Sequence, residues 1–329
     1  MMAGLGEIQA AKSEKILKVL SEKPLFDFVD GNKSLKKLIN KAIKKESGLG
    51  MAVAWNAFRI YKTLKTKLGL NPGSNFENWV TATLKNSNIS TLADLKQLRK
   101  KLPAGLKNIK TDKTLNDAAA KMAIITSDIT THTKAEFPRM AELYWSNPDT
   151  IAPAKMVRAS MSIPFFFEPF EIADMPNAGN ENDPKWNKAA SYRGPVPAKA
   201  RFVDGGMLSN FPINVFHKKG GGAPSMPTFG ARLSTYRESF SETSSMLGMS
   251  GAMISTMRQI YDYETLLKHP DYKKLICRID ADEQFNWLDF NITEKDQVKL
   301  FNLGAQKALD FLLQFDWEGY KVIREKLSH

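Results

Sequence analysis

The stretch that decides the fold is Arg201-Phe-Val-Asp204-Gly205-Gly206-Met-Leu-Ser-Asn210-Phe-Pro212. It begins with the end of an apolar strand and places one carboxylate directly before two glycines. Ser209, Asn210 and Pro212 then have the composition of a helix start. Glycine is used where a backbone needs a positive φ or a close approach, so we expect Asp204 on a tight turn with little bulk around it. Such an aspartate can act as a base toward a neighbouring hydroxyl, or it can accept hydrogen bonds from its own turn amides.

The composition indicates a chain without membrane spans or disulfides. Its 329 residues suffice for one large α/β domain or two smaller ones. No window holds the roughly 18 uninterrupted apolar residues that a membrane helix needs. The first residues lack the pattern of a secretory signal, and Cys277 is the one cysteine. We therefore expect a cytoplasmic or peripheral-membrane location. The formal charge of +12 favours polyanions, and acidic membranes and nucleic acids both qualify.

The first hundred residues are predicted to be helical, with lysine-rich outer faces. Apolar residues recur at helical spacing over residues 11–20, 33–45, 51–68 and 75–84, and Thr91 is expected to cap a further helix. These basic faces are either ordinary solvated surface or a surface for acidic lipid headgroups.

After residue 105 the pattern changes to strands that alternate with helices. A short apolar run predicts a buried strand over 118–126, followed by a polar loop that contains Ser127, Asp128, Thr130 and Thr131. Helices are predicted over 153–162 and 295–314, strands over 229–233 and 274–279, and a loop over 174–199. This order predicts a three-layer α/β/α domain over residues 1–329, with a helical insertion over 33–110.

Four stretches occur in the order found in bacterial patatin-like lipid acyl hydrolases. They are Gly69-Leu-Asn-Pro-Gly73 with Thr91-Leu-Ala-Asp94-Leu95, Val157-Arg158-Ala159-Ser160-Met-Ser-Ile163-Pro164, Phe202-Val203-Asp204-Gly205-Gly206, and Leu300-Phe-Asn-Leu-Gly304. The sequence resembles this family from about residue 7 to residue 325. The resemblance implies a patatin-like hydrolase fold of the α/β class.

The resemblance also implies hydrolysis of an ester in a phospholipid or other acyl lipid by a serine and an aspartate, with no cofactor. Asp204 matches the aspartate that accepts the serine proton, and Gly205 and Gly206 complete its motif. A carboxylate can act in this way only within hydrogen-bond reach of the serine, with its pKa raised by an apolar site.

Three consecutive aromatic residues precede the aspartate motif. Phe165, Phe166 and Phe167 are candidates for the apolar wall of such a site and for a surface that accepts acyl chains. The alternative is that they pack in the core beside a strand, which is the usual place of aromatic residues.

The sequence departs from the family where the nucleophile should be. No Gly-x-Ser-x-Gly occurs in the 329 residues; Gly248-Met-Ser250-Gly-Ala is nearest, but its second glycine comes one place early. No glycine-rich loop precedes Asp204, and Gly220-Gly221-Gly222 follows it as a helix stop. We therefore expect no nucleophile in this chain, as if it began inside the hydrolase domain. It is either part of a longer active product or a non-catalytic lipid- or membrane-binding remnant.

Other chemistries have weaker support. The histidines 132, 217, 269 and 329 have no metal-ligand spacing and are expected on the surface or in loops. Asp280-Ala-Asp282-Glu283 lacks the glycine and the spaced glutamate of a calcium loop. No phosphate-binding glycine loop occurs, and nucleic-acid binding would depend on net charge alone. We therefore expect neither a metal nor a nucleic acid.

Overall fold

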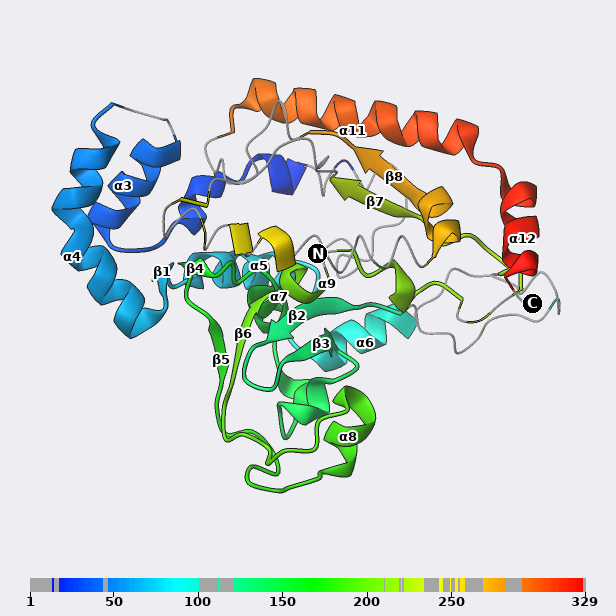
Figure 1. The fold of residues 1–329 in the computed structure, drawn as a ribbon, viewed down its shortest axis with the longest axis horizontal. Coiled ribbons are helices and arrows are strands. Elements are labelled where there is room, and N and C mark those ends of the chain that lie inside the picture. Colours follow the sequence, from blue (N-terminus) through cyan, green and yellow to red (C-terminus); the bar gives the residue numbers. More distant parts are fainter. Residues whose placement is uncertain are drawn as a thin grey trace. The chain divides into compact units, whose positions relative to one another are not determined.

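The structure is a computed structural model, drawn in Figure 1. It describes residues 14, 18–43, 47–100, 112, 121–209, 211–218, 220, 222–233, 243–244, 249, 252–253, 255–257, 269–281 and 292–327. Its contacts divide the chain into two compact units, Met1–Gly205 and Gly206–His329. Each unit is described by itself.

A four-stranded sheet organises the first unit. Its strands are β2 (Ile124–Asp128), β3 (Thr133–Phe137), β5 (Phe170–Ile172) and β6 (Ala200–Asp204), in the order β3-β2-β6-β5. All three neighbouring pairs are antiparallel. In the β2–β6 pair Thr126 lies opposite Asp204, so the candidate base ends a strand at the centre of the sheet.

Strand β2 lies later in the chain than the sequence predicts. The predicted polar loop at Ser127 and Asp128 is wrong, since both residues are buried in the strand. Their polar groups are hydrogen-bonded within the fold: Ser127 Oγ donates to the Asp204 carbonyl at 2.9 Å, and the Asp128 carboxylate accepts from Tyr144 Oη at 3.1 Å. Buried polar groups that have hydrogen-bond partners cost little free energy, so the strand extends through Ser127 and Asp128.

Helices pack around this sheet and close a core. They are α5 (Ser74–Lys85), α6 (Leu92–Lys100), α7 (Pro153–Ser160) and α8 (Pro184–Ala190), with short 3-10 turns η1 (Leu25–Phe28), η2 (Ala141–Leu143) and η3 (Pro148–Thr150). Their inner faces meet the sheet in one cluster that includes Val80, Leu84, Leu92, Leu95, Phe137, Tyr144, Met156, Trp186 and Phe202.

The local signals for these helices are confirmed in most places. Thr91 caps α6, because its hydroxyl accepts from the Asp94 N–H while the Asp94 carboxylate accepts from the Ser90 and Thr91 amides. The predicted continuous loop over 174–199 is wrong, since α8 lies inside it. Asp183 caps α8 and Trp186 is buried in the core, which outweighs the loop-like composition around them.

A helical hairpin forms the outer part of the same unit. Helix α3 (Lys33–Ile43) and helix α4 (Leu49–Lys67) lie side by side (Figure 1), in agreement with the helices expected there. After α4, strand β1 (Gly69–Asn71) pairs in parallel with β4 (Phe165–Phe167). These helices fall within the proposed insertion at 33–110, and most of the helix expected over 11–20 falls outside the described residues.

Among the described residues of the second unit are the short helix α9 (Gly206–Ser209), the 3-10 turns η4 (Ile213–Val215) and η5 (Pro270–Leu275), a parallel pair of strands and the longer helices α11 (Glu294–Gln314) and α12 (Trp317–Lys326). Strands β7 (Gly230–Leu233) and β8 (Ile276–Ile279) confirm the strands expected at 229–233 and 274–279. Helix α11 runs beside β8 (Figure 1), and α12 follows it. Mixed helices and sheets, with parallel strand pairs in both units, confirm the predicted α/β class. Of the described helices, none has the length and apolarity to cross a bilayer.

Candidate active site

Asp204 is the last residue of β6, and its backbone is fixed from two directions. Its N–H donates to the carbonyl of Ser162 at 2.9 Å, and its own carbonyl accepts from Ser127 Oγ at 2.9 Å. The residue is half-buried. Both of these contacts use main-chain atoms of Asp204, so they position the residue without using its carboxylate.

The residue after Asp204 must be a glycine for lack of space. A β-carbon on Gly205 would lie 2.0 Å from the carbonyl oxygen of Ile125, far inside van der Waals contact. The Gly205 N–H donates to the carbonyl of Ser160 at 3.1 Å. The close approach of backbones expected from the sequence is therefore present at Gly205.

The helix after the motif begins earlier than the sequence predicts. It starts at Gly206, and Ser209 is its last residue, so Ser209 ends a helix and does not begin one; the 3-10 turn η4 begins after Pro212. The backbone turns directly into the helix after Gly205, and four residues complete it. Asn210 lies outside the described residues.

The three phenylalanines of β4 have different surroundings. Phe167 is 2% exposed, and its ring lies under the guanidinium of Arg158, 5.6 Å from ring centre to Cζ. Phe166 is half-buried and contacts Phe167 edge to face. Phe165 is 55% exposed. Phe167 thus lies in the core, which was one of the two places expected, and a role of the three rings as an acyl wall stays a prediction.

Three serines surround the backbone of the aspartate motif, and their hydroxyl groups all donate to backbone carbonyls. Ser127 Oγ donates to the Asp204 carbonyl, Ser160 Oγ to the Ile125 carbonyl at 2.6 Å, and Ser162 Oγ to the Arg158 carbonyl at 2.9 Å. A serine that is activated by an aspartate must instead direct its proton at the carboxylate. The hydrogen bonds of these three serines are those of structural residues.

The second unit contains a buried polar cluster that the sequence did not predict. His217, expected on the surface, is buried. Its Nε2 is 2.6 Å from Tyr320 Oη and 3.8 Å from the carboxylate of Asp271. Arg324 donates to the same carboxylate at 2.9 Å and also to the carbonyls of Lys218 and Gly220.

The charge state of this cluster follows from its burial. Desolvation lowers the pKa of His217, and the cation of Arg324 lowers that pKa further, while Asp271 partly opposes both. Burial also raises the pKa of Tyr320 to about 12, so both rings are neutral at pH 7. A neutral histidine between a tyrosine and an ion pair joins α12 to η5, and this contact pattern is structural.

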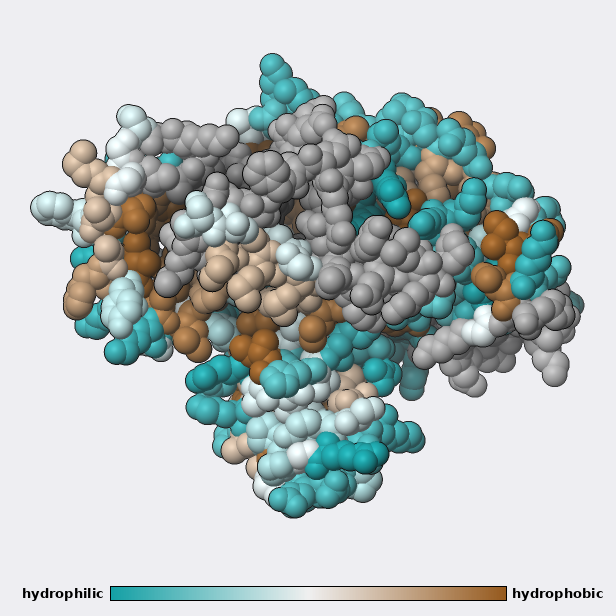
Figure 2. All heavy atoms as spheres, in the orientation of Figure 1, coloured by the Kyte–Doolittle hydropathy of each residue, from teal (hydrophilic) through white to brown (hydrophobic). Residues whose placement is uncertain are grey.

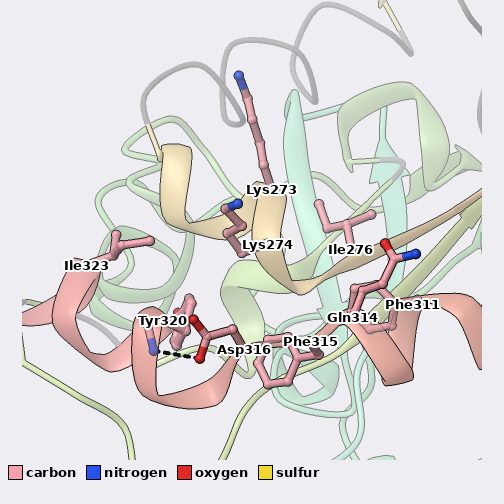
Figure 3. A pocket seen from close by; sticks show the side chains of 10 residues that line it. Lys273, Lys274, Ile276, Phe311, Gln314, Phe315, Asp316, Tyr320 and Ile323 are labelled. Atoms are coloured by element: carbon pink, nitrogen blue, oxygen red, sulfur yellow. Dashed lines mark hydrogen bonds between the residues drawn. The ribbon is translucent and has the colours of Figure 1, made fainter.

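A pocket of about 340 Å³ lies near this cluster, lined by Lys273, Lys274, Ile276, Phe311, Gln314, Phe315, Asp316, Gly319, Tyr320 and Ile323 (Figure 3). The Asp316 carboxylate in it caps α12, accepting from the Gly319 N–H at 2.9 Å. Figure 3 shows the Lys273 side chain directed away from that carboxylate. The lining has no serine, cysteine or histidine. Within the described residues, no group of three or more His, Cys, Asp or Glu could hold a metal ion.

Comparisons with known proteins identify the family. The model for patatin-like phospholipases matches residues 9–217, which include Asp204, Gly205 and Gly206 but not the resembling stretch at Leu300. A protein of Bacillus subtilis (strain 168), described as the uncharacterized protein YqhO, is 26% identical over 253 residues, 76% of this chain and 70% of that protein. No solved structure matches the chain. Because the family model covers more than half of the residues, this chain belongs to the patatin-like phospholipase family.

Proposed function

We propose that the chain contributes the aspartate of a serine–aspartate dyad that hydrolyses an ester bond in a phospholipid or another acyl lipid. Asp204 is the proton acceptor in this proposal. The observation that carries it is the position of Asp204 at the end of a central strand, held through its main chain and followed by a glycine that no larger residue can replace without a shift.

The proposed reaction has two steps. A serine hydroxyl transfers its proton to the Asp204 carboxylate while its oxygen attacks the ester carbonyl, and the protonated Asp204 passes this proton to the leaving alkoxide, so that an alcohol departs and an acyl-serine remains. A water molecule then attacks the acyl-serine and gives a proton to the Asp204 carboxylate, which returns it to the serine oxygen as the fatty acid is released. Neither step needs a metal or a cofactor.

The serine is proposed to lie outside these 329 residues. The sequence has no Gly-x-Ser-x-Gly, and the hydroxyls of Ser127, Ser160 and Ser162 donate to backbone carbonyls. Ser250, in the nearest approach to the motif, falls outside the described residues. We therefore expect no turnover of lipid esters by this chain alone. A cheap test is to translate the reading frame upstream of Met1 and look for the serine motif within about 30 residues, the span of one βα unit.

The lipid substrate also suggests where the protein acts. The charge of +12 and the lysine-bearing helices support peripheral contact with an acidic membrane from the cytoplasmic side. We propose no nucleic-acid partner, because the net charge is the one feature that would support such a partner. The alternative function is a non-catalytic lipid- or membrane-binding protein that keeps the fold without the reaction.

Substitution of the base tests the proposal. In a longer chain that has a Gly-x-Ser-x-Gly segment ahead of residue 1, Asp204→Asn should lower the hydrolysis of a short nitrophenyl ester by about 10²–10⁴, because an amide cannot accept the serine proton. The matched control is Asp149→Asn, which removes an exposed carboxylate paired with Lys96 and should leave the rate unchanged. Circular dichroism checks that both variants fold. An Asp204→Asn protein that keeps most of its activity would refute the assignment.

A further inference from the structure

Helix α4 exposes an unusually apolar face. Met51 is 77% exposed, Trp55 90% and Phe58 78%, and Tyr61 beside them is 62% exposed. The first three are separated by four and three residues, so they lie on one side of the helix. Large apolar side chains at this exposure are ordinary when scattered, but a contiguous group marks an interaction surface.

The other side of α4 is the one that packs on the protein. Ala52, Asn56, Ile60 and Leu64 are half-buried and recur at helical spacing, on the side away from Met51 and the aromatic residues. In Figure 2, tan and brown spheres gather over α4 at the left edge of the view, and hydrophilic ones over its lower end. The helix therefore has an apolar inner face and a second apolar face toward solvent.

The charges on α4 all have one sign. The helix carries Arg59, Lys62, Lys65 and Lys67, and no Asp or Glu occurs between residues 47 and 76. Lys62 and Lys65 continue the exposed stripe toward the C-terminal end of the helix. Its neighbour α3 adds four lysines and no acidic residue.

Helix α11 offers an internal comparison. It also exposes apolar side chains, with Phe301 at 55%, Leu309 at 52% and Leu312 at 55%. Its three lysines are balanced by three acidic residues, so its net charge is zero, against +4 for α4. It also has no tryptophan or tyrosine, the residues that favour the level of the headgroups.

We infer that α4 is the element that docks this chain on an anionic lipid surface, with Met51, Trp55 and Phe58 inserted at the level of the headgroups and with Lys62 and Lys65, on the same stripe, against the lipid phosphates. A helix with aromatic and apolar residues on one side and lysines along it lies in the plane of such an interface. Acidic lipids attract Arg59, Lys62 and Lys65, whereas Lys67 is paired with Glu168, and the apolar stripe then leaves water. The biological purpose of this docking rests on the proposed lipid substrate, but the binding to lipid does not itself require catalysis.

A second copy of the chain is the other occupant to consider. A symmetric interface through α4 would place two helices of charge +4 against each other with no acidic residue on either. Like charges across an interface are destabilising, so the charge pattern favours the lipid surface.

Vesicle binding by the 329-residue chain tests the inference without any measurement of hydrolysis. Co-sedimentation uses vesicles of equal parts phosphatidylcholine and phosphatidylglycerol, and vesicles of phosphatidylcholine alone. The triple variant Met51→Ser, Trp55→Ser and Phe58→Ser should weaken binding to the anionic vesicles about tenfold or more, and so should Lys62→Gln with Lys65→Gln. The matched control, Phe301→Ser with Leu309→Ser and Leu312→Ser on α11, should bind as the unaltered chain does.

Tryptophan fluorescence locates the contact. Lipids brominated in the acyl chain should quench the unaltered protein, and Trp55→Phe should remove most of that quenching while binding is retained. Trp79→Phe is the control, because Trp79 packs against Phe28 and Phe76 and should leave the quenching unchanged.

Each contrary result overturns the docking role. The first is that the α4 triple variant binds vesicles as well as the unaltered chain does, and the second is that the chain binds both vesicle types equally. The third is that Trp55→Phe leaves the quenching intact. The fourth is a dimer in sedimentation that the α4 triple variant converts to a monomer without any loss of vesicle binding. Loss of ester turnover in the longer chain that carries Asp204→Asn, with normal vesicle binding, would leave both proposals standing. Normal turnover in that longer chain would refute the assignment of the base and leave the docking of α4 intact.

Discussion

Gly205 lies so close to Ile125 that a β-carbon at position 205 would be 2.0 Å from the Ile125 carbonyl oxygen. This contact brings the turn after β6 against β2, and the neighbouring residue Asp204 is held by the same packing. A backbone oxygen of a central strand cannot move aside as a flexible side chain would.

Replacing this glycine should therefore destabilise the first unit. Gly205→Ala forces the turn or the strand to shift, and such overpacking costs about 1–3 kcal/mol. Urea unfolding followed by circular dichroism measures the change. Gly50→Ala is the matched control, because no atom lies within 4 Å of its added β-carbon. This helical position should gain up to about 1 kcal/mol from the better helix propensity of alanine. Equal effects of the two substitutions would contradict the steric argument.

Ser127 and Ser160, whose hydroxyls donate to backbone carbonyls, are expected to be structural. In the longer chain that contains a serine motif, Ser127→Ala and Ser160→Ala should leave the rate of ester hydrolysis unchanged. Each should lower the free energy of unfolding by about 1 kcal/mol, the net contribution of one hydrogen bond. Rate and unfolding are measured on the same preparation. A large loss of rate in either variant, with the fold intact, would identify a nucleophile among the residues of this chain.

The helices of the first unit could be predicted because their signals are local. Apolar spacing gave α3, α4 and α5, and the cap of α6 follows from Thr91 and Asp94, three residues apart. Strand β2 was placed too early because Ser127 is satisfied by Asp204, 77 residues away. A partner at that distance leaves no trace in the local pattern.

Two further features depend on tertiary packing, which the local sequence pattern does not predict. His217 is buried by Tyr320, 103 residues later, so nothing near it in the sequence distinguished it from a surface histidine. The apolar periodicity of α4 predicted a helix but not which of its two apolar sides faces the protein. The side that faces the protein is known only from the structure, in which Ile60 and Leu64 are half-buried.

The buried ion pair of the second unit should be sensitive to loss of one partner. Arg324→Leu leaves the Asp271 carboxylate, fully buried, without its cation. Removing one member of a buried pair costs about 3–5 kcal/mol. Hydrogen exchange of α12, followed by mass spectrometry, should show loss of protection. Lys299→Ala, which breaks an exposed pair with Asp296, is the control and should change stability by less than about 1 kcal/mol. Unaltered protection of α12 in the Arg324 variant would show that the pair does not hold the helix.

The same cluster should make the second unit less stable at mildly acid pH. Burial first, and then the charge of Arg324, hold the pKa of His217 below its ordinary value of 6.5, against the opposing effect of Asp271. Tyr272 and His269 also face it, and His269 lowers the pKa as well. Below pH 6.5 the unfolded chain therefore binds a proton that the folded chain does not. The stabilisation is complete above pH 6.5 and is lost as the pH falls toward the lowered pKa.

The loss of stability caused by His217 occurs at a higher pH than the loss caused by protonation of the carboxylates. Hydrogen bonds from backbone amides lower the pKa of Asp94 below 3.8, and its contribution to stability is lost only as the pH falls through that lowered pKa. Exchange protection of α12, measured from pH 7.5 down to about 5, should fall in the unaltered chain, because histidine titrates in that interval. His217→Gln should start from lower protection, because the contact with Tyr320 is altered, but should show little change across the same interval. The slope with pH, and not the starting value, is the readout. A His217→Gln protein with the slope of the unaltered chain would show that another group is responsible for the acid sensitivity.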